Sequence, residues 1–373
     1  MLTQYWTVDP SVAVSADAGS INPSLAAIQE AAEMIRAGKV VAFPTETVYG
    51  LGADARSDAA VERVFAAKGR PSDNPLIVHI ASLSQLDELV GPRSATAQRL
   101  MERFWPGPLT LVLPARPGAV SKLVTAGLPT VAVRRPAHPL ALLLLGAAGC
   151  PVAAPSANRS GRPSPTEASH VKEDLDGCID GIIDGGPTRV GLESTVVEVN
   201  GEHVRVLRPG CVTLAQLEEA LAADASYGGA QISPFVLHAE EDTSAPKSPG
   251  TKYGHYAPRG TMFIVMEHGN DTDSSQRVRN GIQTRLTEAA QRGEKTGVLV
   301  FTHRNTRYKA DLVINLSPNN DLSTAAQGLY SALRRFDTEN ITYILAESCS
   351  EEGIGHAIMN RLLKAAGNRM IYI

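Results

Sequence analysis

The pattern of apolar and polar residues predicts helices and strands that alternate irregularly along the chain. Residues 23–39 form an amphipathic pattern typical of a helix, with Ser24 placed to cap it and Gly38 to end it. An apolar strand at 40–44 and a loop with several glycines at 45–55 follow. Further helices are expected at 58–69, 82–90, 94–105, 139–149 and 214–224, and strands at 75–81, 108–115, 130–136, 150–157, 181–186, 194–200 and 203–210.

Some of these strands follow one another without an intervening helix, which favours a mixed α/β sheet over a strictly parallel one. Residues 225–260 are rich in Pro, Gly and Ser and show little periodicity, so we interpret them as a linker. From residue 261 the order strand, helix, strand, strand, helix, strand, helix predicts a small Rossmann-like domain. We therefore expect a main domain at 1–224, a linker at 225–260 and a second domain at 261–373.

Composition narrows the class of protein. Hydrophobic residues make up 43% and charged residues 20% of the chain, as in ordinary globular proteins. The net charge of -4 argues against coating of nucleic acid by bulk electrostatics, so any polyanion site must be a local cluster of Lys and Arg. The four cysteines are far apart in sequence, which suits a reducing cytosol, and we find no signal peptide or membrane span. We expect a soluble cytoplasmic protein.

The stretch AAKGRPSDNPLIVHI, residues 66–80, holds two cations on a loop stiffened by prolines. Lys68 offers a mobile point charge and Arg70 a planar fork for phosphate oxygens. Because Pro71 and Pro75 restrict the loop, less entropy is lost when a ligand orders it. The alternative is a solvated basic turn at a helix C-terminus, where cations are favoured in any case.

Other polar groups gather at strand ends. In FPTETVYGLG, the hydroxyls of Thr45 and Thr47 follow a strand, where they either hold a small polar ligand or form a polar turn. In TVAVRRPAHP, alternation turns one of two arginines inward, and a buried arginine needs an anion. APSANRSGRPSPT, GLESTVVEV and RVLRPG add serines and arginines. Each alone is most simply a solvated turn, but together they predict a site for a triphosphate and a carboxylate substrate.

Familiar signatures of other sites are absent from the sequence. It has no GxxxxGK[ST], no GxGxxG after a strand and no HExxH, and its histidines are scattered. We therefore expect no metal site built from protein ligands. Any metal should be Mg²⁺ held largely through the phosphates of a nucleotide.

The motifs FPTETVYGLG, KGRPSDNPLIVHI, FWPGPLTLVL, VAVRRPAHP, PSANRSGRPSPT, GLESTVVEV and LRPG, in this order over residues 39–210, resemble the YrdC-type threonylcarbamoyl-AMP synthases. The run SPGTKYGHYAP and the small C-terminal domain resemble the long, two-domain form of that family. The resemblance implies a twisted mixed sheet with a large basic cavity. It also implies a nucleotidyltransferase that makes threonylcarbamoyl-AMP and pyrophosphate from L-threonine, bicarbonate or CO₂, and ATP, for modification of tRNA by a separate transferase complex.

The resemblance also assigns residues. Lys68 and Arg70 would be catalytic, and a linker tyrosine, Tyr253 or Tyr256, would close over the nucleotide. L-threonine would be bound by Thr47, His79, Arg134, Ala154 and Ser194, and ATP by Lys68, Arg70, Asn74, Thr130, Ser156, Ser164 and Arg208.

Two alternatives keep the fold but change the function. The basic cavity could bind RNA, as in a translation or ribosome-assembly factor. A carbamoyl-adenylate module of hydrogenase-maturation proteins is less favoured, because no zinc-finger-like or acylphosphatase-like part is visible. The sequence leaves open the role of the C-terminal domain, the oligomeric state, direct tRNA contact and the identity of the general base.

Overall fold

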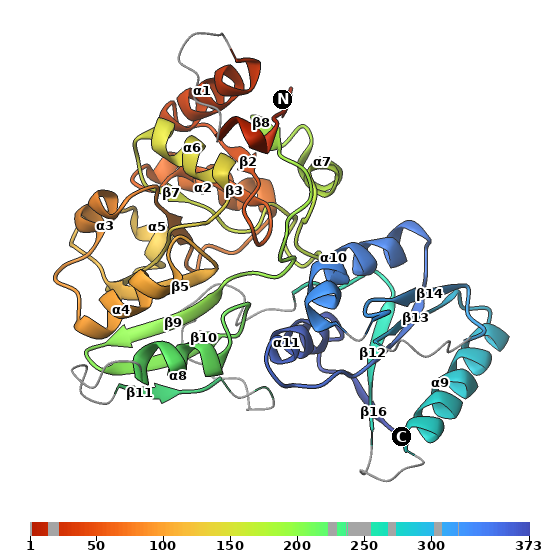
Figure 1. The fold of residues 1–373 in the computed structure, drawn as a ribbon. Helices are drawn as coiled ribbons and strands as arrows, with labels where there is room; N and C mark the ends of the chain where they lie inside the picture. The colour runs from red at the N-terminus through yellow and green to blue at the C-terminus, as the bar shows by residue number, and fades with distance from the viewer. Residues whose placement is uncertain are drawn as a thin grey trace. The chain divides into compact units, whose positions relative to one another are not determined.

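The computed structural model describes residues 2–13, 22–222, 230–235, 237, 255–267, 274–301, 308–319 and 321–373. The chain divides into two compact units, described separately below (Figure 1). Unit 1 comprises Met1–Ser160, Ser164–Arg189 and Glu193–Lys252, and unit 2 comprises Gly161–Pro163, Val190–Leu192 and Tyr253–Ile373. In the described residues, no helix is both long and apolar enough to span a bilayer.

Unit 1 is built on one large mixed sheet, which confirms the predicted fold class. Parallel pairs such as β4 with β6 alternate with antiparallel pairs such as β5 with β6. In sheet order its strands are β1 (Gln4–Thr7), β8 (Gly181–Asp184), β2 (Val41–Phe43), β3 (Gly50–Asp54), β7 (Val152–Ala153), β4 (Ile77–His79), β6 (Thr130–Arg134), β5 (Leu109–Pro114), β9 (Thr195–Asn200), β10 (His203–Arg208) and β11 (Gln231–Ser233).

Helices cover both faces of this sheet. Along β2, Val41 and Phe43 join the apolar cluster of α1 and α6, whereas Ala42 joins the larger cluster of α2, α3, α4, α7 and α8. Burial on both faces explains why this strand is a continuous apolar run. The helices are η1 (Pro10–Ala13), α1 (Pro23–Arg36), α2 (Asp58–Lys68), α3 (Leu83–Leu89), α4 (Ala95–Phe104), α5 (Lys122–Thr125), α6 (Pro139–Ala148), α7 (Ala168–Leu175) and α8 (Leu214–Ala222).

Local chemistry sets the helix ends. Ser57 caps α2 by accepting a hydrogen bond from the Ala60 amide, and Gly69, with φ of 61°, ends it. Lys68 is therefore the last residue of the helix. For α1 the expected cap was wrong: Asn22, not Ser24, is the N-cap, because its side chain accepts from the Ser24 amide.

The expected loop at 45–55 is also partly wrong, since Gly50–Asp54 forms β3, antiparallel to β2. A Cβ on Gly52 would lie 2.8 Å from the Phe43 ring, so glycine is needed for this pairing. The glycines that suggested a loop instead allow a strand to pack closely. Strand β11 likewise lies inside the expected linker and pairs with β10.

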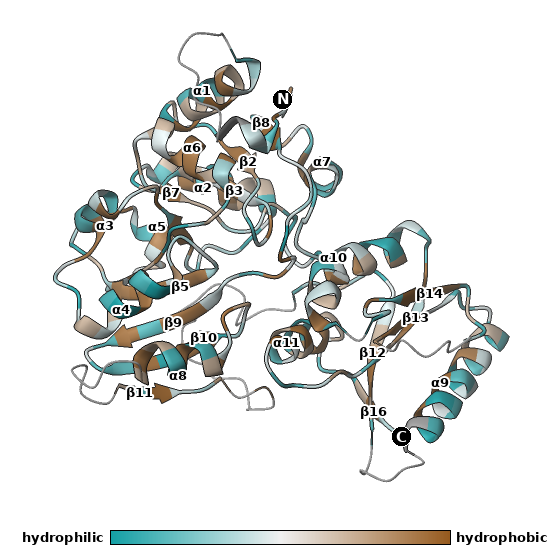
Figure 2. Ribbon diagram, in the orientation of Figure 1, coloured by the Kyte–Doolittle hydropathy of each residue, from teal (hydrophilic) through white to brown (hydrophobic). Residues whose placement is uncertain are grey.

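Unit 2 contains a parallel sheet in the order β14 (Leu312–Asn315), β13 (Thr296–Val300), β15 (Tyr343–Glu347), β12 (Thr261–Met266) and β16 (Met370–Tyr372). Helix α9 (Ser274–Gln291) lies on one side, and α10 (Leu322–Thr338) and α11 (Gly355–Ala365) lie on the other (Figure 1). Strand β15 lies between β12 and β13, which are the first two strands of the unit in chain order. In a dinucleotide-binding sheet, by contrast, the first two strands in chain order are neighbours. In Figure 2, β13 has hydrophobic colours, while α9 carries many hydrophilic residues.

The two short segments of unit 2 are held by its backbone and side chains. The Ala257 amide donates to the Gly161 carbonyl oxygen at 2.9 Å, and Arg334 Nη2 donates to the Pro163 carbonyl oxygen at 2.6 Å. Gly191 has φ of 80°, and a Cβ there would lie 2.4 Å from Gln327 Cα. A side chain at Gly191 would therefore be strained in two ways.

Candidate functional site

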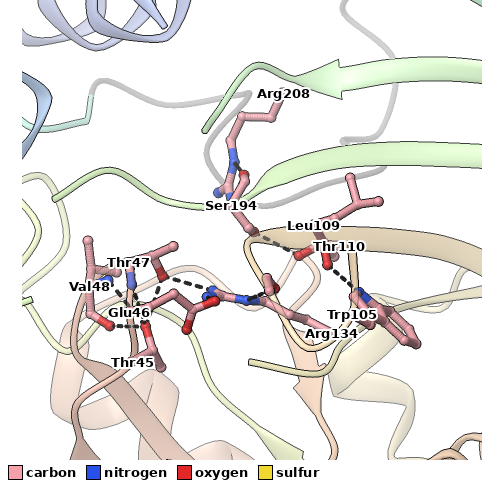
Figure 3. A network of polar contacts seen from close by, with 11 residues as sticks. Thr45, Glu46, Thr47, Val48, Trp105, Leu109, Thr110, Arg134, Ser194 and Arg208 are labelled. Carbon is pink, nitrogen blue, oxygen red and sulfur yellow. Dashed lines mark hydrogen bonds and ion pairs between the residues drawn. The ribbon is translucent and has the colours of Figure 1, made fainter. Parts of the chain in front are cut away.

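Arg134, the last residue of β6, is the centre of a buried polar network (Figure 3). It is 3% exposed, as strand alternation predicted for one of the two arginines. Its Nη1 donates to Thr47 Oγ1 at 2.9 Å, and its Nε donates to the Gly107 carbonyl oxygen at 3.3 Å. Thr45 Oγ1 lies 2.8 Å from Thr47 Oγ1 and donates to the Val48 carbonyl oxygen at 2.6 Å. The motif between β2 and β3 thus packs its threonines onto the arginine.

The anion expected beside a buried arginine is Glu46. Its Oε1 lies 2.6 Å from Arg134 Nη2, and both side chains are almost fully buried. Sequence reasoning did not assign Glu46 a role. The signal was its place between the two threonines of the motif, since a carboxylate there needs a cation once the loop is buried.

His79, the last residue of β4, lies opposite Arg134 in the parallel pairing of β4 and β6. Burial, and next the nearby Arg134 cation, lower the pKa of His79 to about 3. The imidazole is therefore neutral near pH 7 and can bind a ligand by hydrogen bonding without adding charge. It lies edge-on to Phe43, with 6.2 Å between the ring centroids.

A second network links Arg208, Ser194 and Thr110 (Figure 3). Arg208 Nη2 donates to the Ser194 carbonyl oxygen at 3.0 Å and to Ser194 Oγ at 3.2 Å. The two hydroxyl oxygens of Ser194 and Thr110 are 2.7 Å apart. All three residues are buried. Sequence reasoning identified Arg208 and Ser194 but missed Thr110, because a threonine inside a strand looks like an ordinary β-former.

Lys68 is buried at the end of α2, and its amine is used by the protein itself. Nζ donates to the Asn158 carbonyl oxygen at 2.6 Å and also to the Ser156 carbonyl oxygen. Ser156 Oγ in turn donates to Asn158 Oδ1 at 2.6 Å. Burial, and next the neighbouring Arg70 cation, hold the pKa of Lys68 well below its usual value. Lys68 thus ties α2 to the serine-rich loop after β7.

Arg70 and Asn74 lie on the cation loop itself. Arg70 is half-buried, and its Nη2 lies 3.5 Å from the Asn74 carbonyl oxygen. Asn74 is 1% exposed, and its side-chain oxygen and nitrogen form no hydrogen bond within the described residues. Thr130 begins β6, which runs parallel to β4 with Ile77 opposite Ala132. A buried amide without partners is suited to binding a ligand.

Two further predicted residues, Ser164 and Ala154, have separate positions. Ser164 Oγ donates to Glu193 Oε1 at 2.6 Å, and Glu193 is another buried group that sequence reasoning missed. The Ala154 amide donates to the Ile77 carbonyl oxygen at 2.9 Å, next to the start of β4.

Of the two linker tyrosines, Tyr253 lies outside the described residues. Tyr256 belongs to unit 2 and is 5% exposed. The centroid of its ring lies 5.2 Å from that of the Tyr330 ring, and the Arg361 guanidinium lies over the Tyr256 ring.

Comparisons with known proteins cover the whole chain. Residues 33–210 match the family model described as "Telomere recombination" (Sua5_yciO_yrdC), and residues 212–367 match the model "Threonylcarbamoyl-AMP synthase, C-terminal domain". The threonylcarbamoyl-AMP synthase of Bacillus subtilis (strain 168) is 48% identical over 375 residues, covering 100% of both chains. That of Pyrococcus abyssi is 47% identical, covering 93% of this chain and 96% of its own.

A solved structure of Pyrococcus abyssi Sua5 in complex with L-threonine has a TM-score of 0.86. It is 43% identical to this chain and covers 100% of both.

Proposed function

Because the chain belongs to the two-domain threonylcarbamoyl-AMP synthase family, we propose that it forms threonylcarbamoyl-AMP and pyrophosphate from L-threonine, bicarbonate or CO₂, and ATP. The observation that carries the proposal is the convergence of Thr47, His79 and Arg134, from three separate segments, on one buried network. The relatives and the threonine-bound structure support the enzyme, not the RNA-binding alternative.

We assign the amino-acid substrate to this network. Arg134 binds the α-carboxylate, since a guanidinium presents paired donors to a carboxylate. Thr47, the Ala154 backbone and Ser194 bind the remaining polar groups, and neutral His79 adds a hydrogen bond. Hydrogen bonds to the threonine hydroxyl discriminate strongly against analogues that lack it, whereas exclusion of serine depends on a weaker methyl contact.

We assign ATP to the residues around the cation loop and to Arg208. Arg70 binds phosphate and stabilises charge as the carbamate attacks the α-phosphate. Asn74 supplies a buried amide that forms no hydrogen bond to the described part of the chain, supported by Thr130, Ser156 and Ser164. In this structure Lys68 donates to two carbonyl oxygens, so its contribution includes holding the loop of Ser156 as well as adding positive charge.

Between the two linker tyrosines, we favour Tyr253 as the residue that closes over the nucleotide. The ring of Tyr256 is already packed against Tyr330 and beneath Arg361 in unit 2. Moving that ring onto a nucleotide would expose the apolar surface it buries.

The described residues contain no group of three His, Cys, Asp or Glu side chains able to hold a metal ion. We propose that Mg²⁺ enters bound to the phosphates of ATP, where it neutralises their charge. We propose further that the enzyme acts in the cytoplasm and passes its product to a separate tRNA threonylcarbamoyl transferase complex.

Mass spectrometry of the protein incubated with ATP, L-threonine and bicarbonate tests the proposal. Threonylcarbamoyl-AMP should appear, together with pyrophosphate, only when all three substrates are present. Absence of both products, with tight and strongly salt-dependent RNA binding, would instead favour the RNA-binding alternative.

A further inference from the structure

Glu46 is a buried carboxylate with incomplete partners. The residue is 8% exposed, and its Oε1 forms an ion pair with Arg134 at 2.6 Å. Apart from that pair, neither carboxylate oxygen accepts a hydrogen bond from the described residues. A buried carboxylate normally satisfies its oxygens with several donors, so Glu46 can accept a further cationic donor.

The adjoining charges fit an amino acid. Figure 3 shows the Glu46 carboxylate turned toward the Arg134 guanidinium, beside Thr47. A free amino acid carries a carboxylate and an ammonium on the same carbon atom, so a neighbouring cation and anion match its two charges. We propose that Glu46 binds the α-ammonium group of L-threonine and takes up the proton that this group must lose before it reacts. The inference rests on the proposed function and deepens it.

The proton balance of the step is simple. The ammonium transfers one proton to the Glu46 carboxylate, which leaves a neutral amine with a free electron pair. That pair forms the new nitrogen–carbon bond to bicarbonate, while a carbon–oxygen bond of bicarbonate breaks. The departing hydroxide takes a second proton from the same nitrogen and leaves as water, which gives the carbamate anion. Glu46 returns its proton to water before the next turnover.

The other titratable groups near Glu46 do not compete with an ammonium. His138, at the start of α6, interacts with Glu46 and with Arg189, but burial dominates and lowers the pKa of His138 to about 4. His79, next to Arg134, is also neutral near pH 7. Near neutral pH the cation that faces Glu46 from the described elements is therefore Arg134, which the substrate carboxylate can engage.

Calorimetric binding of two ligands to Glu46→Gln tests the first part. L-threonine should bind at least about tenfold more weakly than to wild type, because a charged hydrogen bond is lost. The matching acid with hydroxyl in place of the amine, 2,3-dihydroxybutanoate, should bind without such a loss. If Glu46 only positioned Arg134, both ligands would bind more weakly, and that result would overturn the proposal. Glu202→Gln, an exposed site in unit 1, is the matched control.

The pH dependence of pyrophosphate release tests the proton uptake. In Glu46→Gln the rate constant kcat should rise with pH, because the amine must lose its proton to water instead. A variant with a wild-type pH profile and wild-type threonine affinity would refute the role. Thermal unfolding verifies that the variant folds. If Glu46→Gln does not fold, Glu46→Asp takes its place: its side chain is one methylene shorter, so the charge is kept but lies farther from the ligand. Glu46→Asp should show the same selective loss of threonine affinity. Wild-type protein that does not bind threonine would instead contradict the proposed function itself.

Discussion

Arg208 holds Ser194 by both its backbone and its side chain: one guanidinium nitrogen, Nη2, lies 3.0 Å from the carbonyl oxygen and 3.2 Å from Oγ. This orients the hydroxyl that contacts Thr110. Replacing Arg208 with Lys keeps the charge but removes the planar fork. We expect kcat/KM for threonine-dependent pyrophosphate release to fall about 100-fold, comparable to loss of one transition-state donor.

The same strand provides the control. Arg205 lies on β10 but is exposed, so Arg205→Lys should leave pyrophosphate release and thermal stability unchanged. Equal activity of the Arg208 and Arg205 variants would show that the double contact to Ser194 has no part in the reaction.

Lys68 and Arg70 should differ when replaced by alanine. Both changes are expected to abolish most pyrophosphate release. Lys68→Ala also removes the hydrogen bonds from Lys68 Nζ to the Ser156 and Asn158 carbonyl oxygens, which should lower the free energy of unfolding by about 1–3 kcal/mol. Arg70→Ala should leave stability nearly unchanged. Chemical denaturation of both variants measures the difference, and an equally stable Lys68 variant would contradict the structural role.

His79 should make stability depend on pH. Burial holds its pKa at about 3 in the folded chain, below the ordinary value of about 6.5 for histidine, so between these values the unfolded chain binds a proton that the folded chain excludes. The contribution of His79 to the free energy of unfolding is fully present above pH 6.5. As the pH decreases below 6.5, this contribution falls by about 1.4 kcal/mol per pH unit. Urea unfolding at pH 7 and pH 5 should therefore show a smaller pH effect in His79→Gln than in wild type. Parallel changes in the two proteins would contradict the neutral buried state.

Alanine substitutions of the two linker tyrosines should also have different effects. Tyr256→Ala removes a ring packed on Tyr330 and should lower the stability of unit 2 by about 3 kcal/mol or more. Tyr253→Ala should raise the KM for ATP. Thermal unfolding and ATP titration of each variant test this. A Tyr253 variant with wild-type kinetics would return the nucleotide contact to Tyr256.

Sequence patterns predicted most of the fold because periodicity reports burial directly. Helix α2 begins and ends near its expected limits, since Ser57 and Gly69 mark both ends chemically. Strand β3 was missed because its glycines, read as loop residues, serve close packing against Phe43. The short strand β1 was missed as well, because its partner strand β8 is distant in the sequence.

The candidate site was predictable to the extent that its residues form motifs. The resemblance selected Thr47, Arg134 and Ser194, which the structure places in two buried networks. It did not select Glu46 or Glu193, because their importance comes from partners distant in the chain, Arg134 and Ser164. A single sequence does not reveal such pairings.

The discontinuous make-up of unit 2 matters for dissecting the protein. Gly161–Pro163 and Val190–Leu192 group with it although they precede Tyr253 in the chain. A polypeptide cut before Tyr253 would retain both segments but lose the Ala257 amide and the Arg334 guanidinium that hold the first of them. Separating the halves by proteolysis would therefore strip hydrogen bonds from the peptide directly before Ser164, so that an inactive N-terminal fragment would not by itself prove a catalytic role for the missing piece.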